Sequence, residues 1–497
     1  MIPDSYLARQ IIYTAAVLQT AIAPLAFVYY VYYIATEIPL FTLHPTIDHY
    51  LHYWLGTELI FYVFFQITRN RMQRTPARIA PEPKERRDLF MNCVANVDDI
   101  HSWLPGWFMK GNNPSQPPDF EEICRENAAE WQVSFCPFSW AFFTLPLEDV
   151  LDDPEKKETL DYYITTLEKI YNIQFKPGYN DDLVSFRVNL DPVVAYHRPL
   201  AFYTMITIMT YLYNLCLQVW GMRKYGPEAR SFMPWNVMEP IQPLYEGSQR
   251  ISYWFRDGNR NKKPVVFVHG VGAGLMCYAK FVFSLLSLDA PIFCVELPFV
   301  AMRCVEDVPT MPEIARDFEL MLQYHHFHDA VFVAHSLGTA VTAFALKSIP
   351  KSIAGVVLLD PICFMLHYKD ICTNFVYRIP RTASQYIVKY FGSTELYISH
   401  FISRHFYWFQ VALYVTPVSS HKHIGPVTTP LPRATKVFLS EHDNIVDSYR
   451  ADAYLKRCGI NSVLMEGLDH ASFLFHPEWE RKIIDTINEY TMITDPQ

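Results

Sequence analysis

Ala330-Val-Phe-Val-Ala-His-Ser336-Leu-Gly338-Thr-Ala-Val-Thr-Ala-Phe-Ala345 is the stretch that decides the fold: an apolar run, a serine, then a second apolar run. The first run has the composition of a buried strand, and the second that of a helix. A serine in the tight turn between them is forced out of the line of the backbone, with its hydroxyl exposed above the helix N-terminus. Ala334 and Gly338, two positions to either side, are small enough for so sharp a turn. The stretch therefore predicts that Ser336 is a nucleophile.

The pattern around this turn extends from about residue 237 to residue 497. Short β-branched runs alternate there with helical stretches, which predicts a mainly parallel sheet with crossover helices. The interval 361–432 is too long for a simple crossover and is rich in aromatic residues, so we expect a lid inserted after a strand. The expected strands cover residues 251–255, 265–269, 291–296, 330–335, 354–359, 436–440 and 462–466, and a last helix covers about 477–490.

The composition points to a membrane. Hydrophobic residues make up 51% of the 497 residues and charged residues only 19%, which is unusually apolar for a soluble protein. The net charge is −9 without a long basic run, so nucleic acid is not an expected partner. The 10 cysteines are scattered and form no Cys-x-x-Cys pair, which predicts free thiols in reducing surroundings.

Residues 1–75 read as an N-terminal membrane anchor of one or two helices. Residues 10–36 carry no charged side chain and, at about 1.5 Å per residue, are long enough to cross a bilayer. A second apolar run, 51–68, contains Glu58 near its middle, so it either spans the membrane or lies in the interface as a re-entrant helix. Arginines follow this run, and the positive-inside bias places them on the cytosolic side.

The middle of the chain divides into two segments. Residues 76–198 contain helix-like pieces and no catalytic motif, which predicts a helical accessory region packed on the membrane or on the catalytic domain. Residues 199–222 carry no charge, so they are a second candidate for a transmembrane or membrane-embedded helix. We therefore expect an integral membrane protein of an intracellular membrane, such as the endoplasmic reticulum or the lipid-droplet surface.

A glycine-rich loop earlier in the chain indicates which protein family this domain resembles. Val265-Val-Phe-Val-His-Gly-Val-Gly272 and the turn at Ser336 make residues 237–497 similar to an α/β-hydrolase domain of the membrane-anchored, lipase- or esterase-like kind. The resemblance implies that the backbone N–H groups of Val271 and Leu337 form an oxyanion hole. Leu275 occupies the place of the third glycine in a dinucleotide fingerprint, which argues against a Rossmann interpretation.

A serine also needs a base and an acid, which follow it in this family in the order Ser, Asp or Glu, His. Asp443 follows the expected strand 436–440 and is the predicted acid, with Asp360, after the preceding strand, as the alternative. His470 lies in a loop after the last expected strand and is the predicted base. His442 and Asp447 have the His-x4-Asp spacing of some acyltransferases.

These residues predict acyl transfer to water through an acyl-serine, without a metal or an organic cofactor. The membrane segments and the aromatic lid favour a lipid ester, of the acylglycerol or phospholipid type, with membrane lipids as surroundings. Two alternatives stay open. One is a lipid acyltransferase with the same triad, and the other is a catalytically inactive hydrolase fold that acts as a membrane scaffold.

Overall fold

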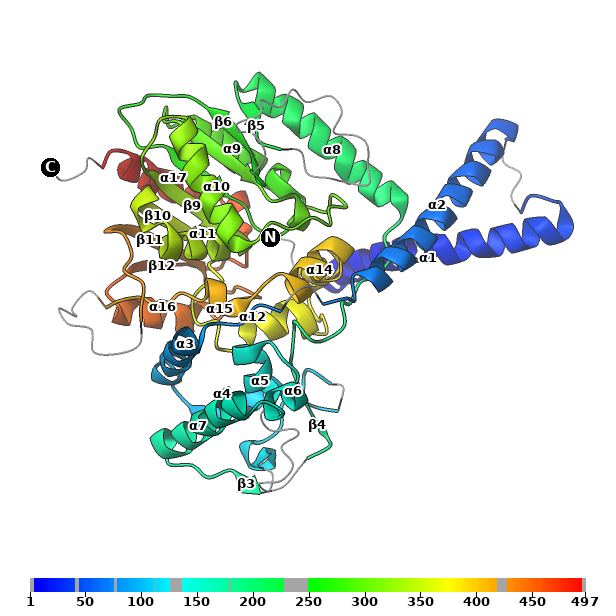
Figure 1. The fold of residues 1–497 in the computed structure, drawn as a ribbon. Coiled ribbons are helices and arrows are strands. Elements are labelled where there is room, and N and C mark those ends of the chain that lie inside the picture. The colour runs from blue at the N-terminus through cyan, green and yellow to red at the C-terminus, as the bar shows by residue number, and fades with distance from the viewer. Residues whose placement is uncertain are drawn as a thin grey trace.

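A computed structural model describes most of the chain. In Figure 1 a central sheet with its helices lies above a smaller helical region, and two long helices project to one side. The described residues are 4–40, 44–75, 78–111, 113–125, 136–177, 180–227, 249–417 and 427–493.

The sheet has eight strands in the order β12-β11-β10-β9-β7-β8-β6-β5. Strands β7 to β12 are parallel to one another, whereas β6 pairs antiparallel with both β8 and β5. The strands are β5 (Arg223–Tyr225), β6 (Ser252–Arg256), β7 (Val265–Val268), β8 (Ile292–Glu296), β9 (Ala330–His335), β10 (Ile353–Leu359), β11 (Ala434–Ser440) and β12 (Asn461–Met465).

All seven expected strands are present, with ends that differ by at most two residues from the expected ones. The sequence pattern missed β5, because Arg223-Lys-Tyr225 contains no apolar run from which a strand could be recognised. This strand pairs with β6 at the edge of the sheet. The sheet therefore begins before residue 237, and that predicted boundary lies outside the described residues.

Alternate side chains of each strand build two separate cores, as the period of two in a strand requires. Val266 and Val268 of β7 belong to one core, and Val265 and Phe267 to the other. The first core is covered by α10 (Met311–Tyr324), α11 (Leu337–Ser348) and α16 (Ser448–Arg457). The second is covered by α9 (Ala279–Leu286), α17 (Pro477–Thr491) and the end of α8 (Leu200–Val219).

The accessory region and the lid continue the first core. One hydrophobic cluster runs from the accessory helices through the lid to the sheet. The accessory elements are α3 (Pro83–Ala95), α4 (Ile100–Trp103), η1 (Pro105–Trp107), β1 (Phe108–Lys110), η2 (Phe120–Glu122), β2 (Cys124–Arg125), α5 (Cys136–Phe143), α6 (Leu147–Leu151), α7 (Pro154–Tyr171), β3 (Lys176–Pro177) and β4 (Leu183–Ser185). The lid elements are α12 (Asp370–Cys372), η7 (Thr373–Tyr377), α13 (Ala383–Ile387), η8 (Val388–Ser393), α14 (Leu396–Arg404) and α15 (Trp408–Val411).

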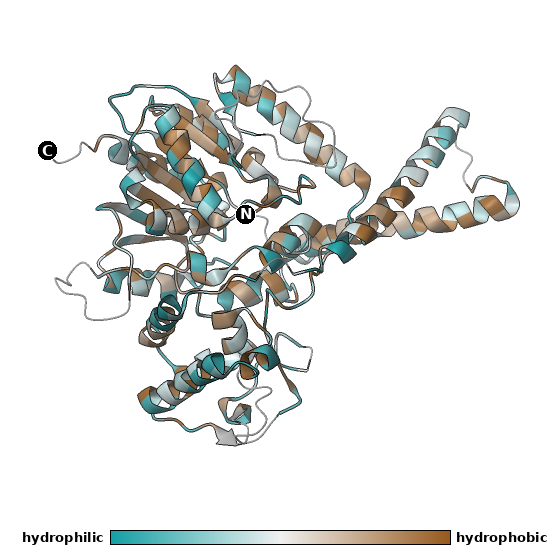
Figure 2. Cartoon of the chain, in the orientation of Figure 1, coloured by the Kyte–Doolittle hydropathy of each residue, from teal (hydrophilic) through white to brown (hydrophobic). Residues whose placement is uncertain are grey.

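The N-terminal helices α1 (Tyr6–Thr36) and α2 (Pro45–Arg71) form a hairpin that projects from the rest (Figure 1). The hairpin is largely apolar on its surface (Figure 2). Its base reaches the lid, where the N–H of Ala383 donates to Asp4 at 3.0 Å and Tyr13 packs edge-on to Tyr386. Among the described helices, α1 and α8 are long and apolar enough to cross a bilayer.

The carboxylate of Glu58, in the second apolar run, forms hydrogen bonds with the start of helix α8. Glu58 of α2 is fully buried and accepts hydrogen bonds from the N–H groups of Leu200 at 2.7 Å and Ala201 at 3.0 Å. These are the first two residues of α8, whose own N-cap residue, Pro199, provides no capping side chain. Trp54 donates its indole N–H to the same carboxylate. Glu58 therefore caps α8 from a neighbouring helix.

We expect Glu58→Ala to lower the stability of the detergent-solubilised protein by about 2 kcal/mol, because the first N–H groups of α8 lose their charged acceptor. Glu58→Gln keeps an acceptor oxygen and should lose clearly less. Thermal unfolding followed by tryptophan fluorescence measures both. Equal Tm values for Glu58→Ala and the wild type would show that the capping contacts contribute nothing.

Candidate active site

Ser336 lies in the sharp turn between β9 and α11. Its backbone has φ 50° and ψ −120°, a conformation that non-glycine residues rarely adopt and that costs on the order of 1–3 kcal/mol. The N–H of Ser336 donates to the carbonyl of Leu359 on β10 at 3.0 Å, which helps to hold the turn. A strained serine between a strand and a helix is the geometry of a nucleophile elbow.

Two of the small residues around the turn are each required by a different close contact. A Cβ on Gly338 would lie 2.2 Å from the carbonyl oxygen of Val268, so no other residue fits there. A Cβ on Gly270 would lie 2.9 Å from the Cβ of Ser336, so the glycine-rich loop also approaches the elbow closely. Ala334 is fully buried in β9 and has room for its methyl group, which explains an alanine where the usual elbow has glycine.

Three predicted residues come together at this turn. His470 Nε2 lies 2.9 Å from Ser336 Oγ, and His470 Nδ1 lies 2.6 Å from Asp443 Oδ2. Because a carboxylate can only accept, Nδ1 carries the proton and Nε2 is free to accept the proton of the serine hydroxyl. The other oxygen of Asp443 accepts the N–H groups of Ile445 and Val446, which fixes the carboxylate.

The predicted oxyanion residues flank the same place. Leu337 is the first residue of α11, so its N–H has no acceptor within the helix. Val271 lies in the loop after β7, where the N–H of the next residue, Gly272, donates to the carbonyl of Val300 at 3.2 Å. Val271, Ser336 and Leu337 line one cavity.

The alternative acid is also buried beside the histidine, but it has different partners. Asp360 accepts the N–H of Ala471 at 2.9 Å and both the N–H and the hydroxyl of Ser440. Nδ1 of His470 contacts Asp443 instead. Asp360 therefore holds the residue after the predicted base without touching the base itself.

A further hydrogen-bond chain lies beneath the elbow, and nothing in the sequence pattern indicated it. The hydroxyl of Tyr278 accepts the N–H of Gly270 at 3.1 Å, so its own proton is free to go to Nδ1 of His335 at 2.6 Å. Nε2 of His335 then faces Asp360 at 3.7 Å. The chain links the glycine-rich loop to the loop of His470 through the elbow.

Nearby carboxylates determine the pKa of His470, the predicted base. Burial on its own would lower the pKa of His470, but the negative charge and hydrogen bond of Asp443, with smaller contributions from Asp360 and Asp469, raise it to about 9. The carboxylates therefore stabilise the protonated form of the imidazole.

Two sets of residues have the composition of a metal site or of an acyltransferase motif. Donor atoms of Asp360, Asp443 and His470 lie within 4.8 Å of one another, but the carboxylates already accept N–H groups of the backbone, which is the pattern of a hydrogen-bonded site. Asp447 caps α16 and pairs with Arg450, while His442 is exposed beside Glu441, so these two do not form an acyltransferase motif.

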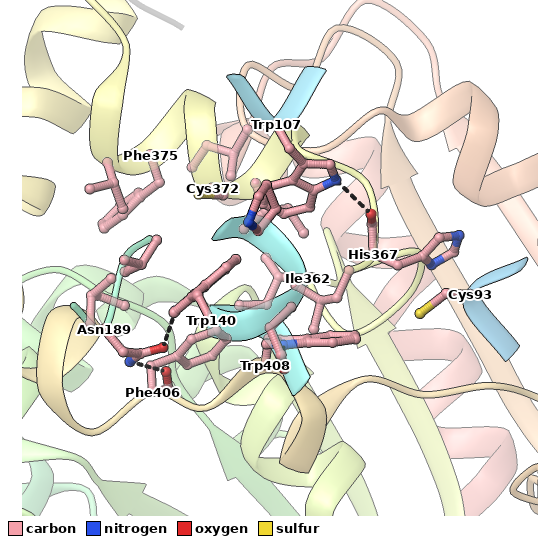
Figure 3. Close-up of a pocket in the computed structure, with 18 of the residues that line it drawn as sticks. Cys93, Trp107, Trp140, Asn189, Ile362, His367, Cys372, Phe375, Phe406 and Trp408 are labelled. Carbon is pink, nitrogen blue, oxygen red and sulfur yellow. Dashed lines mark hydrogen bonds between the residues drawn. The ribbon is translucent and has the colours of Figure 1, made fainter. Parts of the chain in front are cut away.

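Ser336 is one of the residues that line an apolar cavity. Figure 3 shows part of the wall of this cavity. The cavity encloses about 1080 Å³ of space free of atoms, including the open space at its mouth. Residues of the accessory region and the lid form most of its wall, and several of them are aromatic. Among them are Trp103, Trp107, Trp140, Phe375 and Trp408.

Residues 265–481 match the model of the alpha/beta hydrolase family. The strand order, the elbow and this match together show that this part of the chain is an α/β-hydrolase domain. A search of curated proteins finds no significant match.

Solved structures of other hydrolases are similar to part of the chain. Carboxylesterase CesB from Bacillus subtilis is 14% identical over 57% of this chain and 98% of its own, with a TM-score of 0.35. A bacterial membrane phospholipase A is 11% identical over 59% of this chain and 94% of its own, with a TM-score of 0.37. A hydrolase from Pseudomonas aeruginosa is 14% identical over 50% of this chain and 96% of its own, with a TM-score of 0.33.

Proposed function

We propose that the protein is a membrane-associated serine hydrolase that cleaves carboxylic esters of lipids. The observation that carries the proposal is the hydrogen-bonded chain from Ser336 through His470 to Asp443, with Ser336 in the wall of an apolar cavity. A buried, strained serine with an aligned base and acid is an activated nucleophile.

In the proposed reaction, Nε2 of His470 takes the proton of Ser336 as Oγ attacks the ester carbonyl. The N–H groups of Val271 and Leu337 stabilise the oxyanion, and each such donor is worth about 100- to 1000-fold in rate. His470 then gives the proton to the leaving alcohol. Water, activated by the same histidine, hydrolyses the acyl-serine and regenerates the enzyme.

Membrane association and a lipid substrate are supported by the surroundings of the site. The lid helix α13 packs on α1, a helix of 31 residues that is long and apolar enough to span a bilayer. The exposed side of α8 is also apolar, with Met205, Ile208 and Leu212 about half exposed. A lipid ester embedded in the membrane would therefore lie next to the lid.

Treatment of the detergent-solubilised protein with a fluorophosphonate tests this function. We expect covalent modification that peptide mass spectrometry locates at Ser336, and release of a free fatty acid from acylglycerol or phospholipid vesicles. Transfer of the acyl group to an added alcohol or lysolipid in preference to water would favour the acyltransferase. A folded protein that neither reacts nor hydrolyses any ester would support the inactive scaffold.

A further inference from the structure

Most of the cavity wall comes from the accessory region and from the lid. The rest of the hydrolase domain contributes Val271, Ser336, Leu337 and Ile445 to it. The part of the chain without a catalytic motif therefore shapes the space into which a substrate must extend.

The polar atoms at one side of this wall are turned away from the cavity. The indole N–H groups of Trp103 and Trp107 both donate to the carbonyl oxygen of His367, at 2.7 and 3.2 Å. Figure 3 shows the bond from Trp107. The imidazole of His367 is itself occupied, by the hydroxyl of Tyr414 at Nδ1 and the carbonyl of Asn96 at Nε2.

The other side of the wall is arranged in the same way. Trp140 donates its indole N–H to Asn189 Oδ1 at 3.2 Å, and the amide of Asn189 donates to the carbonyl of Phe406 at 3.0 Å. Trp408 donates to the carbonyl of Ala141 at 2.9 Å. The tryptophans of the wall therefore present carbon to the cavity.

These hydrogen bonds determine which kind of chemical group binds favourably in the cavity. A polar group that entered the cavity would lose its water and find these donors and acceptors already paired. An alkyl chain has no hydrogen bonds to water that it could lose, and each buried methylene strengthens binding by about fourfold. A sugar or peptide ester fits poorly, whereas an unbranched acyl chain fits well.

The same hydrogen bonds fix the shape of the cavity. Trp103 and Trp107 lie in the accessory region and His367 in the lid, and the bond from Trp408 to Ala141 crosses between the same two parts. Phe142 adds an edge-on contact with Trp408 at 5.9 Å between ring centroids. The accessory region and the lid thus form one tied wall.

We infer that the accessory region is the acyl-chain selector of this enzyme: helix α5 and the segment 103–107 hold the chain of a lipid ester and limit its length. The inference rests on the proposed ester hydrolase function. It assigns to a region without a catalytic motif the specificity for the acyl part of the substrate.

Helix α5 offers a matched pair of substitutions. Phe142 and Phe143 are adjacent and equally buried, with 3% and 2% of their surfaces exposed. Phe142 lines the cavity, whereas the ring of Phe143 carries the guanidinium of Arg86 at 4.4 Å. Phe142→Leu should widen the cavity, Phe143→Leu is its control, and Ala141→Leu should narrow it.

The readout is the ratio of kcat/KM for p-nitrophenyl palmitate to that for the butyrate. Because both values come from one preparation, the ratio does not depend on the folded fraction. Ala141→Leu should lower the ratio by about tenfold, since the added side chain displaces one or two methylenes. Phe142→Leu should raise the ratio, and Phe143→Leu should leave it unchanged.

A cross-linking measurement on the wild-type protein tests the same inference without a substitution. A fluorophosphonate with a photoreactive group at the end of a long alkyl chain, once bound to Ser336, should cross-link to peptides that contain residues 93–107 or 136–142. Cross-links confined to other parts of the chain would overturn the inference even if no variant folds.

The outcomes separate the two proposals. If no ester is hydrolysed and Ser336 does not react, the proposed function fails. If Ser336 reacts but the ratio is the same in all three variants, or moves equally in Phe143→Leu, the function stands and the acyl-chain selector is wrong.

Discussion

Ser336→Ala and His470→Ala should each lower kcat for ester hydrolysis by about 10⁶-fold, and the double variant should be no slower than either single one. The reason is that the two side chains act as a unit: Nε2 accepts the proton that leaves Oγ, at a separation of 2.9 Å. Once either is absent, the other has nothing to contribute. Steady-state kinetics with one soluble ester measures all three variants.

His442→Ala is the matched control for this series, because His442 lies one residue before the predicted acid but is exposed, with 65% of its side chain accessible. Its kcat should stay within about twofold of the wild-type value, because substitutions of exposed side chains usually have small effects. Multiplicative losses in the double variant, or full activity of His470→Ala, would contradict a serine–histidine unit.

The sequence predicted the sheet well because each central strand is a short apolar run, such as Val265–Val268, that is buried on both faces of the sheet. The resemblance to the α/β-hydrolase family, in which the order along the chain is Ser, Asp or Glu, His, also led to the prediction that Ser336, Asp443 and His470 lie close together. The structure places these side chains within hydrogen-bond distance. Motif spacing and strand order were thus sufficient to predict the sheet and these three residues.

Other features depend on contacts between distant parts of the chain. Trp140 and Trp408 are 268 positions apart, and no local pattern indicates that both line one cavity. The same holds for Glu58, whose burial is satisfied by helix α8 more than a hundred residues later. Tertiary packing decides such features, and the sequence shows only the residues that take part.

The choice between the two buried carboxylates has the second large expected effect. Asp443→Asn should lower kcat by about 10⁴-fold, because an amide N–H facing Nδ1 of His470 would favour the tautomer that cannot accept the serine proton. Asp360→Asn should cost about tenfold or less, since Asp360 contacts the N–H of Ala471 and not the imidazole. The same ester assay measures both variants.

The pH dependence of kcat/KM separates the roles further. Activity requires neutral His470, so it should rise with pH through the pKa of that group, which the carboxylates raise above its ordinary 6.5. The charge of Asp360 contributes to this rise, so Asp360→Asn should move the ascending limb of the profile to lower pH. Asp443→Asn should instead remain slow at every pH, because its defect is the tautomer. If Asp360→Asn lowered kcat by 10⁴-fold and Asp443→Asn lowered it only mildly, Asp360 would be the catalytic acid. Asp443 would then be only a nearby negative charge.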